Sequence, residues 1–201
     1  PIDPVRHITN ASTGKMGYAL AKACLRRGAQ VTLITGPSLI SMKAWEAFTP
    51  ITMLPVASAA QMCEAALKHF DQSDISILCA AVADFTPADK AEQKIKKQPG
   101  QTSMTIEMTT TTDIAATLGQ RKRADQQLVG FALETHDEMH NAQRKLQSKN
   151  LDMIVLNSLQ DTGAGFGTDT NKVTFLYPNG TIKNLPLMSK EEVADEIISH
   201  L

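Results

Sequence analysis

Short runs of apolar and β-branched residues alternate with amphipathic windows of helical periodicity along most of the chain. This order is typical of helices that cover a largely parallel sheet, so it predicts an α/β fold. The expected strands lie at 31–36, 51–56, 75–84, 102–108, 128–133 and 152–157. The expected helices lie at 14–27, 58–70, 112–119 and 137–149, and a last helix begins at the capping box of residues 189–192. We expect the strand at 75–84 to be central in the sheet, because its run is the most apolar.

Two segments depart from this alternation. Residues 85–100 hold Pro87, Pro99 and four lysines with almost no apolar periodicity, so we expect a mobile excursion there rather than a packed element. Residues 173–187 place an Asn-Gly turn between two strand-like runs, and this pattern predicts a β-hairpin.

Composition and charge narrow the class of protein. The chain has 201 residues, 42% of them hydrophobic, which suits one globular domain over residues 1–201. Its 20 basic and 21 acidic residues nearly balance. The chain therefore lacks the excess of positive charge that general binding to nucleic acids or to acidic membrane surfaces requires. No apolar run has the length of a membrane span and no signal peptide is evident, so we expect a cytoplasmic protein. The chain begins without Met in a loop-like segment, and we expect an upstream strand to precede it.

The loop RHITNASTGKMG (6–17) is the first candidate site, because small and polar residues stand directly before a predicted helix. Free backbone N–H groups at such a helix start bind phosphate or carboxylate. The segment is not a Walker A loop, since Thr9 stands where a glycine is needed and Met16 where Ser or Thr is needed. It also lacks a dinucleotide fingerprint glycine, where Ser12 stands. An anion site and an ordinary helix start both stay open on this pattern.

A second candidate site follows the apolar strand, where CAAVAD (79–84) offers small residues and then an acidic one. Ligands of open α/β sheets bind at the carboxyl ends of strands, and Asp84 could accept hydrogen bonds from a ribose. Asp84 could equally be a strand-end turn residue. Lys145 and Lys149 share one face of a predicted helix, where they would neutralise a polyphosphate or form an ordinary solvated face.

Taken together, five segments resemble phosphopantothenoylcysteine synthetase, which in bacteria is the C-terminal half of a bifunctional coenzyme A biosynthesis protein. In the order and spacing of that family, the segments are DPVRHITNASTGKMG (3–17), CAAVADF (79–85), KIKK (94–97), VGFALET (129–135) and AGFGTDTN (164–171). The resemblance covers essentially all of the chain. It implies a three-layer α/β/α Rossmann-like domain, a flap at about 85–100 and a C-terminal β-hairpin dimerisation arm at about 173–187.

The resemblance also implies an activity, that of a ligase with CTP as co-substrate. The carboxylate of 4′-phosphopantothenate attacks the α-phosphate of CTP, pyrophosphate leaves, and the amine of L-cysteine displaces CMP from the acyl-cytidylate. Mg²⁺ is expected on the triphosphate, with no metal ligand from protein side chains. The implied partners are a second copy of the chain and a fused or associated flavin-dependent decarboxylase.

Roles for single residues follow from the same resemblance. Asn10 and Lys94 correspond to the residue that holds the acyl-cytidylate and to the flap lysine, and Arg6 lies with Asn10 in the substrate segment. The residues expected to bind the nucleotide are Ser12, Gly14, Cys79, Ala80, Asp84, Thr112, Asp113, Ile114, Ala115, Phe131, Lys145 and Lys149. The chain departs from the family at 110–113, where Thr-Thr-Thr-Asp replaces a Lys-Asn-Pro-Asp type of sequence.

Two other classes of function stay open beside the ligase. A nicotinamide-dependent oxidoreductase would use a similar sheet, but the chain lacks the GxGxxG fingerprint and a Tyr-x-x-x-Lys pair. A regulatory nucleotide- or pantothenate-binding domain would keep the fold without the chemistry, and the presence of both Asn10 and Lys94 argues against it.

Overall fold

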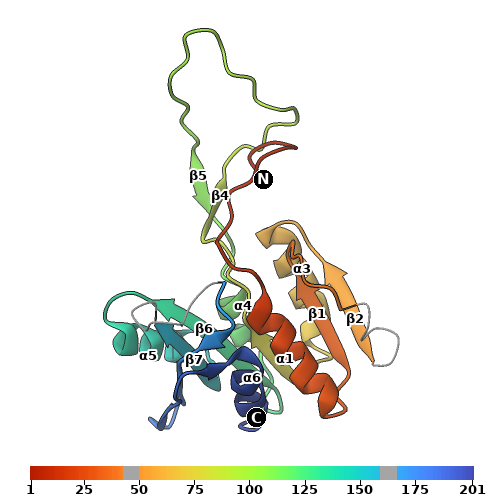
Figure 1. Cartoon of the computed structure of the whole chain (residues 1–201), viewed down its shortest axis with the longest axis vertical. Helices are drawn as coiled ribbons and strands as arrows, with labels where there is room; N and C mark the ends of the chain where they lie inside the picture. Colours follow the sequence, from red (N-terminus) through yellow and green to blue (C-terminus); the bar gives the residue numbers. More distant parts are fainter. Residues whose placement is uncertain (43–49, 159–166) are drawn as a thin grey trace.

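The computed structural model describes residues 1–42, 50–158 and 167–201 (Figure 1). Its helices are α1 (Lys15–Arg26), α3 (Ala59–Phe70), α4 (Ile114–Arg121), α5 (Glu138–Ser148) and α6 (Lys190–Ile198). Its longer strands are β1 (Val31–Thr35), β2 (Ile51–Pro55), β3 (Ile75–Leu78), β6 (Gln127–Glu134), β7 (Met153–Ser158) and β9 (Val173–Leu176). Its short strands are β4 (Phe85–Pro87), β5 (Met108–Thr110), β8 (Thr170–Asn171), β10 (Ile182–Asn184) and β11 (Met188–Ser189). The five helices expected from the sequence are confirmed.

The main sheet has five strands in the order β10-β9-β7-β6-β3. Strands β3, β6 and β7 run parallel, whereas β9 and β10 are antiparallel to their neighbours. The α/β fold with a largely parallel sheet is therefore confirmed. The central position expected for 75–84 is wrong, because β3 is an edge strand of the sheet. The strand already ends at Leu78, and Ile75 is 45% exposed. Strand β7 is central instead, and the small residues after Leu78 leave the sheet as a loop.

Helices cover both faces of this sheet, so the domain has three layers, with the sheet between two layers of helices. One face packs on α1 and α6 around Val129, Val155 and Phe175. The other face packs on α3, α4 and α5 around Leu128 and Ile154. Alternate residues of β6 and β7 therefore belong to opposite cores, as the period of a strand requires.

Helix α1 lies between two sheets, because β1 and β2 form a separate parallel pair (Figure 1). Its residues Ala19 and Ala23 pack against the main sheet. Tyr18 and Leu25 pack instead with Leu33 of β1. The apolar stripe of α1 is thus buried on two sides.

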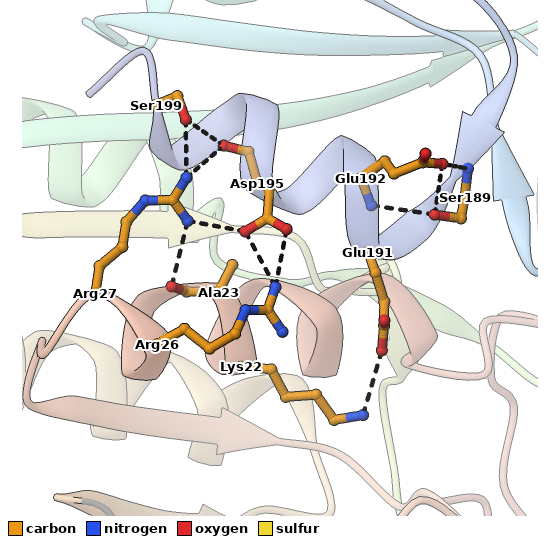
Figure 2. A network of polar contacts seen from close by, with 9 residues as sticks. All are labelled: Lys22, Ala23, Arg26, Arg27, Ser189, Glu191, Glu192, Asp195 and Ser199. Carbon is orange, nitrogen blue, oxygen red and sulfur yellow. Dashed lines mark hydrogen bonds and ion pairs between the residues drawn. The ribbon is translucent and has the colours of Figure 1, made fainter.

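Polar contacts fix α1 against α6 (Figure 2). The Asp195 carboxylate accepts hydrogen bonds from Arg26 and Arg27, with nitrogen to oxygen distances of 2.9–3.0 Å. Lys22 pairs with Glu191 at 3.6 Å. Ser189 caps α6 in the expected capping box. These contacts join the C-terminal half of α1 to α6.

Strands β4 and β5 form an antiparallel ribbon that projects from the body of the molecule, with a long loop at its far end (Figure 1). The expected strand at 102–108 is shorter and later in the chain, since pairing begins at Met108. Residues 85–100 are not wholly without regular structure, because β4 pairs with β5 at their start. The N-terminal turn lies beside the ribbon, from which the chain runs back to α1 (Figure 1).

The hairpin expected at 173–187 is formed by β9 and β10, with a turn at residues 178–180. Strand β9 is buried within the main sheet and β10 is its edge strand. The arm is thus built into the sheet, while the element that projects is the β4–β5 ribbon.

Candidate nucleotide site

The start of α1 offers backbone donors to a ligand. Gly14 is its N-cap at φ 80°, a conformation that favours glycine, and no side chain caps the helix. The Ser12 hydroxyl accepts a long hydrogen bond of 3.4 Å from the Gly14 amide. An uncapped first turn with the positive end of the helix dipole is suited to an anion.

Asn10 joins this loop to the loop that follows β3. Its Nδ2 donates to the carbonyl oxygen of Ala81 at 2.8 Å. Because β3, β6 and β7 are parallel, their carboxyl ends meet at this edge of the sheet. The two candidate sites expected from the sequence therefore lie together, at the place where open α/β sheets bind ligands.

Cys79 and Phe131 lie on the α1 side of the sheet at this edge, where both pack against the core that α1 and α6 share. Burial raises the pKa of the Cys79 thiol to about 12, although the charge of Lys190 lowers it slightly. The thiol is therefore neutral near pH 7 and is not a nucleophile. Ala80 is exposed beside it.

Asp84 is exposed at the end of the same loop. Its carbonyl oxygen accepts from the Thr111 amide at 2.9 Å, and the Thr111 hydroxyl donates to the Ala83 carbonyl at 2.7 Å. Thr111 was not expected as a site residue from the sequence, yet it fixes residues 83–84 against the start of α4. Thr112 is exposed next to it.

Asp113 is the N-cap of α4, where its side chain accepts from the Ala116 amide at 3.0 Å. Ile114 is buried in the core, so only its backbone can face a ligand, and Ala115 is half-buried. Lys149 Nζ lies 2.9 Å from Asp113 Oδ2. Burial raises the pKa of Asp113, but the Ala116 amide and the Lys149 ammonium together hold it below its usual value.

Lys145 is also paired, with Nζ 2.6 Å from Oε1 of Glu134 at the end of β6. The two lysines thus meet carboxylates from two other elements rather than open solvent. Their position is set partly by Gly119 of α4, because a Cβ there would lie 1.9 Å from the Lys149 carbonyl oxygen. This close approach of α4 and α5 needs a glycine.

Arg6 and Lys94 lie with the ribbon rather than in this group. The Arg6 guanidinium binds the buried carboxylate of Asp3 and the carbonyl of Ile95. Lys94 is exposed. Asp3 was not singled out from the sequence, although an Asp directly before a proline is a common turn signal.

Lys15 and Lys190 were also not expected in the site. Lys15 Nζ lies 2.6 Å from Asp169, and Lys190 Nζ donates to the Thr168 hydroxyl and the Thr170 carbonyl. Both tie the end of the AGFGTDTN motif to the start of α1 and α6, while residues 164–166 of that motif lie outside the described residues.

Within the described parts of the chain, no group of three His, Cys, Asp or Glu side chains is arranged to hold a metal ion. No described helix is long and apolar enough to cross a membrane.

The fold and this edge define a Rossmann-like α/β domain in which an uncapped helix start and a strand-end loop meet. The chain belongs to the family described as the DNA/pantothenate metabolism flavoprotein C-terminal domain, which matches residues 1–201.

Relatives and solved structures agree with this family. The chain is 52% identical over its whole length to the coenzyme A biosynthesis bifunctional protein CoaBC of Bacillus subtilis (strain 168), and covers 48% of that protein. It is 51% identical to a cysteine/cysteine sulfinic acid decarboxylase of an unknown prokaryotic organism, with 98% of the chain and 54% of the relative covered. The crystal structure of a CoaBC C-terminal domain matches with a TM-score of 0.79 at 39% identity, covering 99% of this chain and 86% of that one. The chain thus spans about half the length of these curated relatives.

Proposed function

We propose that the protein is a phosphopantothenate–cysteine ligase of coenzyme A biosynthesis, with CTP as co-substrate. The observation that carries this proposal is the hydrogen bond between Asn10 and Ala81, since it joins the two loops that correspond to the acyl-cytidylate and nucleotide segments of the family. The match of the whole chain to a pantothenate metabolism family and to the corresponding half of CoaBC supports the same reaction.

The start of α1 would bind the triphosphate. Ser12, Gly14 and the first-turn amides supply donors and the helix dipole without a high net charge. Lys145 and Lys149 would add two ammonium groups from the C-terminal end of α5, each donating both to its present carboxylate partner and to phosphate oxygens. Negative charge moves onto phosphate in every step of the reaction, so catalysis by positioned donors is suitable.

The nucleoside would lie against the loop after β3. Backbone groups of Cys79 and Ala80 approach the ring, Asp84 accepts from the ribose hydroxyls, and Phe131 borders the nucleotide. The backbone at 112–115 would contact it from the start of α4. Because the family lysine near this point is replaced by threonine, no charge from residues 110–112 contributes.

Asn10 would hold the activated acyl group. Its neutral amide donates a hydrogen bond to a carbonyl or phosphate oxygen without fixing the anion as a full charge would. Lys94 would bring a positive charge to the intermediate when the segment at 85–100 covers it and excludes water, which otherwise hydrolyses the acyl-cytidylate.

Mg²⁺ would be held by oxygens of the triphosphate and by water molecules, several of which Mg²⁺ usually keeps when it binds phosphates. It would neutralise charge on the leaving pyrophosphate. L-Cysteine enters second, and its amine attacks the acyl carbon as CMP leaves. The protein would act in the cytoplasm as a homodimer, with a flavin-dependent decarboxylase fused to it or associated with it.

The test is pyrophosphate release with each substrate omitted in turn. We expect release that requires both CTP and phosphopantothenate, with CMP and the cysteine adduct formed when L-cysteine is added. ATP in place of CTP tests the choice of nucleotide. No release with both substrates present would refute the ligase, and release without phosphopantothenate would indicate simple hydrolysis of CTP to CMP and pyrophosphate.

A further inference from the structure

Asp3 is a buried carboxylate outside the group of residues assigned to the nucleotide. Its side chain is 0% exposed, although it lies in the N-terminal turn beside the projecting ribbon (Figure 1). Both of its oxygens accept hydrogen bonds, so burial leaves neither without a partner.

The two oxygens have different partners. Oδ1 accepts from the amides of Val5 and Arg6, both at 2.8 Å, and closes the local turn. Oδ2 accepts from the Ile95 amide at 3.1 Å and from the Arg6 guanidinium. One oxygen therefore builds the turn, while the other joins the turn to a segment 92 residues away.

The backbone of Ile95 is bound on both sides. Its N–H donates to Asp3, and its carbonyl oxygen accepts from Arg6 Nη2 at 2.9 Å. A further contact, from the Ala91 amide to the Ile2 carbonyl at 3.0 Å, holds the same loop four residues earlier. Lys94 lies between these two attachment points.

We propose that Asp3 is a positioning residue, which fixes the backbone of the loop that carries Lys94 and thereby sets how effectively Lys94 acts. This inference rests on the proposed function, in which Lys94 reaches the intermediate. Arg6 acts in the same way, since its guanidinium joins Asp3 to Ile95.

Electrostatics support the attachment. The Arg6 guanidinium beside Asp3 holds the pKa of that carboxyl well below its usual range, even though burial raises it. Hydrogen bonds to charged groups are stronger than neutral ones, so the loop is held by charge-assisted contacts.

The variant Asp3→Asn separates the two oxygens. An asparagine keeps one oxygen to accept from Val5 and Arg6, so the turn remains. Its NH₂ group replaces Oδ2 and faces the donors of Arg6 and Ile95, which it cannot satisfy. Asp125→Asn is the matched control, because Asp125 is an exposed partner of Arg123.

Kinetics of Asp3→Asn, Lys94→Gln and the double variant test the coupling. We expect Asp3→Asn to lower kcat about 10-fold or more through mispositioning, with KM for CTP changed less than about 2-fold. The double variant should be no slower than Lys94→Gln alone, because both changes remove the same contribution. Multiplying losses, or normal kcat in Asp3→Asn, would overturn the proposal.

Trypsin cleavage after Lys94, Lys96 and Lys97 provides a readout that needs no activity. Cleavage should be faster in Asp3→Asn than in the unmodified protein and unchanged in Asp125→Asn. Equal cleavage in all three would overturn the attachment. An unmodified protein without ligase activity would refute the proposed function, while the cleavage rates would still decide whether Asp3 holds the loop.

Discussion

Lys149 at the end of α5 and Asp113 at the start of α4 are joined by an ion pair of 2.9 Å. The same carboxylate caps α4 through the Ala116 amide, so one side chain serves both a helix and a lysine assigned to the nucleotide. The two roles can be separated by substitution.

Asp113→Asn should keep the cap and lose the charge, because Asn caps helices as well as Asp does. We expect stability to change by less than about 1 kcal/mol, as for an exposed pair. Asp113→Ala should cost about 1 kcal/mol more through loss of the cap. Urea unfolding at pH 7 measures both. At acid pH the advantage of Asp over Asn should vanish, because a carboxyl with a lowered pKa loses its contribution as pH falls through that pKa. A difference in unfolding free energy between the unmodified protein and Asp113→Asn that grows on acidification would contradict this.

Gly119→Ala should be strongly destabilising, since its Cβ would lie 1.9 Å from the Lys149 carbonyl oxygen. Overpacking of this kind costs about 1–3 kcal/mol, measured by urea unfolding. Gly17→Ala in α1 is the control, because nothing beyond its chain neighbours and the backbone of its own helix lies within 4 Å of the Cβ it would add. That control should be more stable by about 0.5–1 kcal/mol, since alanine favours a helix. Similar effects at both positions would refute the close approach.

Asn10→Asp should abolish cysteine-dependent product formation and leave the fold intact. The aspartate cannot donate to the Ala81 carbonyl, and it adds a negative charge beside the acyl-phosphate. Product formation and the melting temperature are measured together. Asn179→Asp in the β9–β10 turn is the control, because its oxygen still accepts from the Thr181 amide. Normal turnover in Asn10→Asp would remove Asn10 from the mechanism.

The buried Cys79 thiol should make the free energy of unfolding fall at alkaline pH. A thiol whose pKa is raised to about 12 favours folding in its neutral form, and that contribution is lost as pH rises from its unfolded pKa toward the folded one. Unfolding free energies of the protein and of Cys79→Ala should therefore converge between about pH 8.5 and pH 12. A constant difference over this range would show that the thiol is not buried.

Two substitutions can locate the interface of the proposed dimer. Ile182 is 45% exposed on edge strand β10, and Phe85 is 55% exposed on the ribbon. If the hairpin is the dimerisation arm, Ile182→Lys should give a monomer in sedimentation at micromolar concentration, and Phe85→Ser should not. Dissociation by Phe85→Ser alone would move the interface to the ribbon. A monomer before any substitution would refute the dimer.

The fold could be predicted from the sequence where local signals agree. The stripe of α1, the Ser189 cap and the Asn-Gly turn each determine their element through short-range physics. The place of β3 could not be predicted, because apolarity reports burial and not strand order. The pairing of β4 with β5 joins short strands across a long loop, a contact that periodicity does not reveal.

The candidate site was predictable in its two loops but not in their connections. Motif spacing indicates that residues 6–17 and 79–84 carry function, and Asn10 joins them in the structure. The carboxylate partners of Lys145 and Lys149 come from distant elements, so helical spacing alone leaves both lysines looking solvated. Asp3 was missed because its burial depends on Ile95, far along the chain.

Helix α1 is buried against both sheets, so ligand binding at its start is coupled to the local unfolding of both. Ala23 faces the main sheet and Leu25 faces the β1–β2 pair, so opening either sheet exposes one side of the same helix. A ligand bound at the start of α1 would therefore slow amide hydrogen exchange in both sheets, including the β1–β2 pair that it does not touch.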